Sequence, residues 1–202
     1  MKNFLITGAA GFIGSALARK LVKNNNVTTI DNLSTGFESN IPKGVNFING
    51  DCSDIETINK LNNQKFDCIF HIAGQSSGEI SFENPAYDLK TNTLSTLLLL
   101  NYAKKNKCKK FIYASTMSVY GDQKEEKANE SMYCNPKSFY AVGKLASENY
   151  CKIYSSKNLN ITCLRLFNVY GPGQNMKNLK QGMVSIYLEQ IFNKKELIVK
   201  GS

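Results

Sequence analysis

A tyrosine and a lysine four residues apart form the pair in this sequence best suited to proton transfer. Tyr140 and Lys144 stand in the run Tyr-Ala-Val-Gly-Lys, and residues at this spacing share one face of a helix. A phenol titrates at about pH 10 and is a poor base at neutral pH. A nearby positive charge favours the phenolate, so Tyr140 is a candidate general base. Taken alone, the pair is more typical of two exposed residues on an amphipathic helix.

Hydroxyl side chains precede this pair. Ser115 and Thr116 follow the apolar run Lys110–Ala114, which predicts a buried strand. A hydroxyl just beyond such a strand can bind a substrate oxygen that loses its proton. The alternative is the polar start of a loop, where Ser and Thr are common.

Three glycines near the N-terminus form a candidate phosphate-binding turn. Gly8, Gly11 and Gly14 lie between the apolar run 3–6 and the helical pattern 15–22. The first lets the turn close, the second lets the backbone approach a pyrophosphate, and the third lets helix and strand pack closely. The helix N-terminus then directs free N–H groups at the phosphates. The G-x-x-G-x-x-G spacing differs from G-x-G-x-x-G, and glycines alone also fit an ordinary turn.

An acidic residue supports the phosphate-binding interpretation. Asp31 ends the β-branched run Val27–Ile30, about 20 residues beyond the glycines, where a carboxylate accepts hydrogen bonds from an adenosine ribose. The same charge repels a 2′-phosphate, which favours NAD over NADP. The alternative is a loop residue followed by Asn32 in a turn. The glycines make ribose binding the favoured interpretation.

Short apolar runs alternate with helical patterns along the chain. We expect strands at 3–6, 27–30, 45–49, 66–73, 110–114 and 160–165. We expect helices at 15–22, 54–61 (capped by Ser53 or Asp54), 84–105 and 137–155, with a polar loop at 121–136. This alternation predicts a Rossmann-type, doubly wound parallel α/β sheet of six to seven strands in the order 3-2-1-4-5-6.

Ligands of such sheets bind beyond the carboxyl ends of the strands. Several polar or small residues fall at these ends, and we expect them to meet in one crevice: Asp31, Asp51, Ala73, Gly74, Ser115, Thr116 and Asn168.

Composition indicates one α/β domain in a reducing compartment. The 202 residues are 42% hydrophobic and 20% charged. No apolar run approaches the roughly 20 residues of a membrane span, and no signal-peptide core is present, so we expect a cytoplasmic protein without a membrane partner. Six scattered cysteines without a C-x-x-C pair, together with a lone histidine, favour reduced thiols and no metal site.

The net charge of +9 is concentrated in a basic run at 104–110. This run follows a leucine-rich segment and lacks the interleaved aromatics of a nucleic-acid surface. We therefore expect a solvated helix end, no nucleic-acid partner, and a charge that helps attract an anionic substrate.

Together these motifs resemble the extended short-chain dehydrogenase/reductase family. The glycine turn, Asp31, the Ser115–Gly121 run and Tyr140-x-x-x-Lys144 are similar to its NAD-dependent nucleotide-sugar epimerase/dehydratase branch. The runs 31–36, 71–75 and 165–173 resemble UDP-glucose 4-epimerases. The resemblance covers essentially the whole chain.

The resemblance implies a role for individual residues. Its NAD-binding positions fall on Gly8, Gly11, Phe12, Ile13, Gly14, Asp31, Asn32, Asp51, Cys52, Ala73, Gly74, Gln75, Asn92, Ser115, Tyr140 and Lys144. Tyr140 is the implied base, Lys144 holds the nicotinamide ribose, and Thr116 bonds the reacting sugar hydroxyl. Asn168 contacts the substrate phosphates, and Asn92 supports the lysine or a water.

Met117 and Ser118 separate the activities within the family. Similar dehydratases carry Asp-Glu there, and Met117 cannot transfer a proton. The resemblance therefore favours epimerisation through a 4-keto sugar over dehydration. A decarboxylase of UDP-glucuronate uses the same Tyr, Lys and Thr and stays open, as do a reductase and a non-catalytic NAD-binding module.

Members of this family are longer and add a C-terminal substrate domain. We therefore expect an NAD-binding domain over 1–172 and the start of a truncated substrate region over 173–202, with catalysis by this chain an open question. The family dimerises through the helices at 84–105 and 137–155, which implies a homodimer; the leucines there also fit a buried core.

Overall fold

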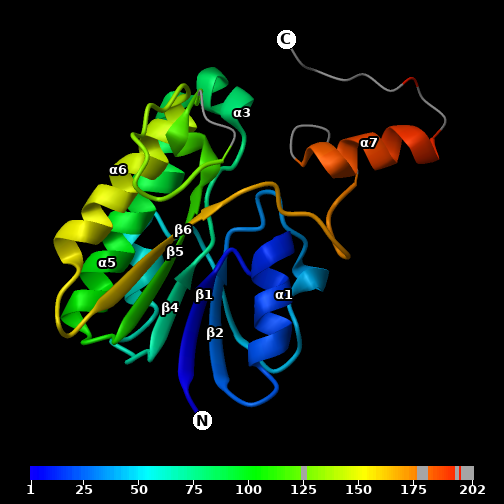
Figure 1. Ribbon diagram of the computed structural model, residues 1–202. Coiled ribbons are helices and arrows are strands. Elements are labelled where there is room, and N and C mark those ends of the chain that lie inside the picture. Colours follow the sequence, from blue (N-terminus) through cyan, green and yellow to red (C-terminus); the bar gives the residue numbers. More distant parts are fainter. Residues whose placement is uncertain (124–126, 177–181, 194–195, 197–202) are drawn as a thin grey trace.

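A parallel sheet of six strands runs through the described residues, which are 1–123, 127–176, 182–193 and 196 (Figure 1). Its order is β3-β2-β1-β4-β5-β6, and each neighbouring pair is parallel. The strands are β1 (Asn3–Thr7), β2 (Asn26–Asp31), β3 (Asn46–Asn49), β4 (Cys68–His71), β5 (Lys110–Thr116) and β6 (Asn160–Leu166). The predicted fold class and strand order are confirmed.

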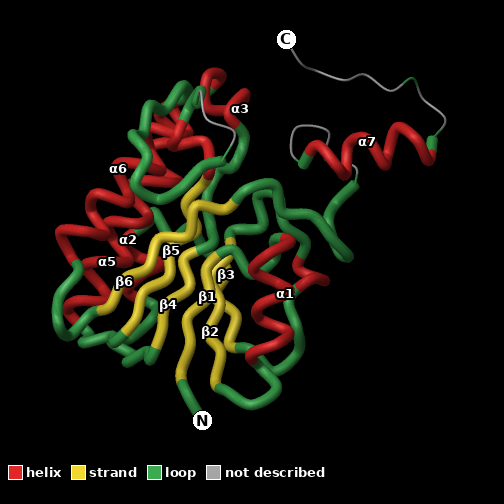
Figure 2. The backbone as a smooth tube through the Cα atoms, in the orientation of Figure 1, coloured by secondary structure: helices red, strands yellow, loops and turns green. Residues whose placement is uncertain are grey.

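Helices cover both faces of the sheet, with α1 on one side and α5 and α6 on the other (Figure 2). The helices are α1 (Phe12–Leu21), α2 (Ile55–Asn59), α3 (Gly78–Glu83), α4 (Pro85–Leu89), α5 (Ser95–Lys105), α6 (Phe139–Tyr154) and α7 (Met183–Phe192). Short 3-10 helices occupy η1 (Glu38–Asn40) and η3 (Met117–Tyr120), and η2 (Lys90–Leu94) is a π-helical turn.

The core follows the alternation of side chains along the strands. Leu5 and Ile6 are neighbours in β1, are both fully buried, and point to opposite faces. Leu5 belongs to the larger cluster, which includes Leu99 from α5, whereas Ile6 packs with Ala18 from α1. A strand buried on both faces explains the short, wholly apolar run in the sequence.

The elements differ from the predictions in four details. The helix expected over 84–105 is α4, η2 and α5 in succession, because Asn84 caps a new helix at Pro85 and η2 widens the next turn. Helix α3 was not predicted. Asp54 stands at the start of α2, but its side chain makes no capping hydrogen bond. The expected strand over 66–73 is shorter, at Cys68–His71.

Other sequence expectations concern the surface and the thiols. All six cysteines are free, and the lysines of the 104–110 run are exposed. No helix in the described ranges has the length and apolarity to span a membrane. Residues 197–202, the end of the expected substrate region, lie outside the described residues.

Candidate active site

A cavity of about 520 Å³ opens where the six strands end. It gathers residues that are far apart in the sequence but close at this edge of the sheet. Its lining includes Gly8, Gly11, Phe12, Ile13, Gly14, Asp31, Asn32, Asp51, Cys52, Ala73, Gly74, Gln75, Ser115, Thr116, Tyr140, Lys144 and Asn168. Of the site residues predicted from sequence, Asn92 is the one behind this lining, next to Gly74.

The glycine turn is packed too closely to admit side chains. Gly8 has φ +75°, and a Cβ there would lie 2.8 Å from the backbone nitrogen of Ala73. A Cβ on Gly14 would lie 2.1 Å from the carbonyl oxygen of Gly8. The start of α1 is therefore pressed against the turn, and its free N–H groups face the cavity.

We expect Gly14→Ala to weaken NAD binding and to lower the free energy of unfolding by about 1–3 kcal/mol, as overpacking does. The added methyl must push α1 away from Gly8. Calorimetric titration with NAD and urea denaturation measure the two effects. Gly78→Ala is the matched control, because its Cβ would meet nothing closer than 3.9 Å. Equal behaviour of the two variants would contradict the tight turn.

Asp31 is held in place by the backbone of two loops. Its Oδ2 accepts a hydrogen bond from the Ala10 N–H (2.9 Å), and its Oδ1 accepts one from the Leu33 N–H (2.8 Å). The carboxylate therefore ties the end of β2 to the glycine turn. Each oxygen keeps acceptor capacity for a ribose hydroxyl in the cavity.

Asp51 and Cys52 lie at the neighbouring edge of the cavity. The Asp51 carboxylate accepts hydrogen bonds from the Ser53 N–H (2.8 Å) and from the Asn32 amide (3.4 Å). Burial and the charge of Asp51 raise the pKa of the Cys52 thiol to about 12. The Cys52 thiol, which lines the cavity here, is therefore neutral and unreactive.

Tyr140 and Lys144 are buried, not exposed on the helix surface. Helix α6 begins next to them, where the Ser138 hydroxyl accepts a hydrogen bond from the Ala141 N–H (3.1 Å). Tyr140 is 9% exposed and Lys144 is 4% exposed. The Lys144 Nζ donates to the carbonyl oxygen of Ala114 at 3.0 Å. Both side chains therefore point inward, toward the end of β5.

On balance, the residues around Tyr140 do not lower its pKa, contrary to the expectation from the sequence. Burial raises the pKa of Tyr140, and a hydrogen bond with Thr116 opposes that rise. Lys144 Nζ lies 5.8 Å from the centre of the Tyr140 ring and is bonded to a backbone oxygen. Burial lowers the pKa of Lys144 to about 8. Tyr140 is therefore a neutral phenol that can donate a proton as well as, once ionised, accept one.

Thr116 ends β5 directly before Met117 and Ser118. Its hydroxyl oxygen accepts a hydrogen bond from the Ser118 N–H and its O–H donates to the Ser118 hydroxyl, both at 3.2 Å. Met117 and Ser118 begin η3 and also line the cavity. The cavity lining at Thr116, Met117 and Ser118 thus carries hydroxyls and a thioether, and no carboxylate at positions 117 and 118.

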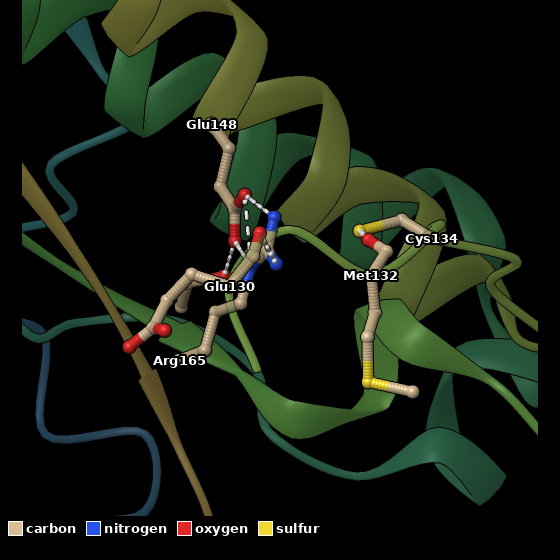
Figure 3. A network of polar contacts seen from close by, with 6 residues as sticks. Glu130, Met132, Cys134, Glu148 and Arg165 are labelled. Atoms are coloured by element: carbon tan, nitrogen blue, oxygen red, sulfur yellow. Dashed lines mark hydrogen bonds and ion pairs between the residues drawn. The ribbon is translucent and has the colours of Figure 1, made fainter. Parts of the chain in front are cut away.

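A buried ion pair fixes the end of β5 and was missed by the sequence analysis (Figure 3). Glu148, on α6, accepts hydrogen bonds from the Ser115 hydroxyl and from Arg165 Nε (3.0 Å) and Nη2 (2.8 Å). Arg165 also donates to the carbonyl oxygen of Glu130. The pair joins α6, β5, β6 and the preceding loop. The available signal was Glu148, one helical turn beyond Lys144 on the same face.

His71 is a neutral core residue that links three elements. Thr7 on β1 lies 2.8 Å from His71 Nδ1, and Thr96 on α5 lies 3.1 Å from Nε2. The Thr96 hydroxyl donates to the carbonyl oxygen of Asn92, so it accepts from Nε2, which must carry the proton. Burial lowers the pKa of His71 to about 3. Within the described residues no group of three or more potential ligands is placed to hold a metal ion.

We expect His71 to make the protein less stable as the pH falls below about 6.5. In this range the unfolded histidine binds a proton, whereas the folded one stays neutral down to a pKa of about 3. The unfolded state therefore binds more protons, and the free energy of unfolding falls by up to about 1.4 kcal/mol per pH unit. Urea denaturation at pH 7, 6 and 5 measures this slope. His71→Gln, which removes the lone histidine, should flatten it; an unchanged slope would contradict the assignment.

The fold and the cavity define a class of protein: a doubly wound domain that binds a dinucleotide. The close-packed glycine turn provides N–H donors for a pyrophosphate, and Asp31 provides acceptors for a ribose. Tyr140 and Lys144 line the same cavity. These features fit NAD.

Comparison with known proteins identifies the family. Residues 4–202 match the model of the NAD dependent epimerase/dehydratase family. This chain belongs to that NAD-dependent enzyme family.

Individual relatives agree with this assignment. The chain is 35% identical over 98% of its length to a putative UDP-glucose 4-epimerase of Methanocaldococcus jannaschii, and it spans 65% of that protein. It is 32% identical over its whole length to UDP-glucuronic acid decarboxylase 1 of Xenopus tropicalis, of which it spans 48%. The crystal structure of the Thermotoga maritima UDP-glucose 4-epimerase with UDP-glucose superposes with a TM-score of 0.93 at 35% identity, covering 99% of this chain and 66% of that one.

Proposed function

We propose that this chain is the NAD-binding and catalytic part of a nucleotide-sugar 4-epimerase of the UDP-glucose/UDP-galactose type. The observation that carries the proposal is the meeting of Tyr140, Lys144 and Thr116 in the cavity that also contains the glycine turn. The presence of 4-epimerases among the relatives supports the choice within the family.

The proposed reaction assigns each of these side chains a task. Bound NAD would supply the acceptor for the hydride from C4 of the sugar and the donor that returns it to the opposite face of the 4-keto sugar. Tyr140 takes the proton of the sugar 4-hydroxyl and later gives it back. The Thr116 hydroxyl holds the same oxygen. Lys144, buried and cationic below a pKa of about 8, holds the nicotinamide ribose and favours the tyrosinate.

Met117 and Ser118 support epimerisation over dehydration. Elimination of water needs an acid and a base beside the sugar, and a thioether can be neither. Decarboxylation of UDP-glucuronate is the second candidate, because it needs the same Tyr, Lys and Thr and because a decarboxylase is among the relatives.

Product analysis separates the candidates. The protein is incubated with NAD and, in turn, with UDP-glucose, UDP-galactose and UDP-glucuronate. Interconversion of the first two supports the epimerase, whereas a UDP-pentose with release of CO₂ supports the decarboxylase. NAD binding without any product would mean that this chain is a binding module and would contradict the epimerase proposal for it.

The substrate region and the oligomer belong to the same proposal. Residues 1–172 form the NAD-binding domain, and 173–202 begin the substrate region, with Gln174 and Asn175 at the cavity. A homodimer is supported by exposed apolar side chains on α3, α4 and α6, among them Phe82, Leu89, Phe139 and Val142. Light scattering on the purified protein tests the dimer. The free thiols favour a cytoplasmic location.

A further inference from the structure

A buried carboxylate lies behind the cavity and has no part in the reaction described above. Asp88, on α4, is 1% exposed. Its Oδ1 accepts hydrogen bonds from Gln75 Nε2 (2.7 Å) and from Asn92 Nδ2 (3.0 Å). Both donors are amide NH₂ groups, so this oxygen acts purely as an acceptor. Asp88 thereby joins the segment after β4 to the π-helical turn η2.

The amide of Asn92 is oriented by these bonds. Its Nδ2 uses one hydrogen on Asp88 and the other on the carbonyl oxygen of Gln75 (2.9 Å). Its Oδ1 is buried and has no hydrogen-bond partner within the described part of the chain. A Cβ on Gly74 would lie 2.3 Å from this Oδ1 and 3.3 Å from Lys144 Nζ. The unpartnered acceptor therefore faces the ammonium side of the cavity.

The buried ammonium of Lys144 needs a negative charge nearby to offset the cost of its burial. Among the described residues, four titratable groups act on it or face it: His71 from β4, Tyr113 from β5, Tyr140 from α6 and Asp88 from α4. The imidazole is neutral, and burial raises the pKa of both phenols. Glu148, the next acid along α6, is paired with Arg165. Asp88 is therefore the acidic group that opposes the loss of the Lys144 proton.

A π-helical turn lies next to this carboxylate. Such a turn holds an extra residue and is frequently found at functional sites. Here η2 contains Asn92 and follows directly on the helix that carries Asp88. Gly143 completes the packing, because a Cβ there would lie 3.4 Å from Asp88 Oδ2 and 3.1 Å from the Thr93 hydroxyl. The carboxylate therefore packs closely against α6 at Gly143, the residue before Lys144.

We infer that Asp88 is a positioning residue for Lys144: it directs the Asn92 carbonyl toward the lysine and supplies the negative charge that keeps the buried ammonium protonated. The consequence for catalysis rests on the proposed function, since the ammonium is useful there for holding NAD and stabilising the tyrosinate. The electrostatic role itself requires neither a bound cofactor nor a substrate.

The Asp88→Asn variant tests this role, because it keeps the size and one acceptor oxygen and removes the charge. The protonation of Lys144 is followed by NMR of protein labelled in the lysine side chains, with Lys144→Met identifying the signal. We expect the titration midpoint, near 8 in the native protein, to fall by about one pH unit, a tenfold loss of proton affinity. Glu56→Gln, which removes an exposed acid on α2, is the matched control and should leave the midpoint unchanged.

A double variant keeps the test decisive if Asp88→Asn folds poorly. If the charge of Asp88 stabilises the Lys144 ammonium, Asp88→Asn should destabilise the Lys144→Met protein less than it destabilises the native protein. Urea denaturation of the native protein, the two single variants and the double variant measures this difference. An unchanged Lys144 midpoint in folded Asp88→Asn, or equal destabilisation in both backgrounds, overturns the inference. Failure of the native protein to bind NAD would instead overturn the proposed function, so the two outcomes are distinct.

Discussion

The Tyr140→Phe variant is expected to oxidise a nucleotide sugar about 10²–10⁴-fold more slowly than the native protein, the usual effect of losing a general base. Phenylalanine keeps the ring against Lys144 but removes the oxygen that bonds Thr116. The reduced nicotinamide formed during the half-reaction is followed by its absorbance, and product by chromatography. NAD affinity should change little, because the glycine turn and Asp31 are untouched.

Tyr133→Phe is the matched control for this variant. Tyr133 is 82% exposed, and its substitution also removes one phenolic oxygen. We expect native rates from it. Near-normal turnover by Tyr140→Phe would exclude Tyr140 as the base and would leave Thr116 or a water in that role.

Arg165→Met is expected to lower the free energy of unfolding by about 3–5 kcal/mol, because it leaves a buried carboxylate without its cation. The Glu148 side chain is 4% exposed, and three of its hydrogen bonds come from Arg165. Among the described residues, the Ser115 hydroxyl would then remain as the donor to this carboxylate. Urea denaturation measures the loss.

Two further variants test whether the unpaired Glu148 carboxylate causes this loss of stability. Adding Glu148→Gln to the arginine variant should recover part of the stability, since no buried charge then remains. Lys137→Met removes one partner of an exposed pair, in which Lys137 Nζ lies 3.9 Å from Asp122, and should cost less than about 1 kcal/mol. A loss of that small size from Arg165→Met would mean that the pair is not effectively buried.

Much of the fold was readable from local patterns. Each strand buried on both faces forms a short apolar run, as Leu5 and Ile6 show, and the glycines mark the turn that follows β1. Helix α3 and the π-helical turn η2 were not predicted. Helix α3 is only six residues long, and η2 contacts α6, which is distant in the chain, through the Thr93 hydroxyl and the carbonyl oxygen of Gly143.

The sequence predicted which residues form the candidate site, but not how deeply they are buried or which charges surround them. The chain order places Asp31, Thr116 and Tyr140 at or after strand ends, and parallel strands bring those ends together. Sequence did not reveal that Tyr140 and Lys144 are buried, nor that Asp88 and Glu148 stand behind them, because burial and charge pairing arise between elements distant in the chain.

The amino-acid sequence by itself determined the alternation of elements, the phosphate-binding turn and the Tyr-x-x-x-Lys spacing, since all of these depend on side chains close together in the chain. Tertiary structure alone decided which charges are compensated. Burial next to β5 makes a cationic lysine costly, and a carboxylate from α4, more than fifty residues upstream, is the group placed to offset that cost.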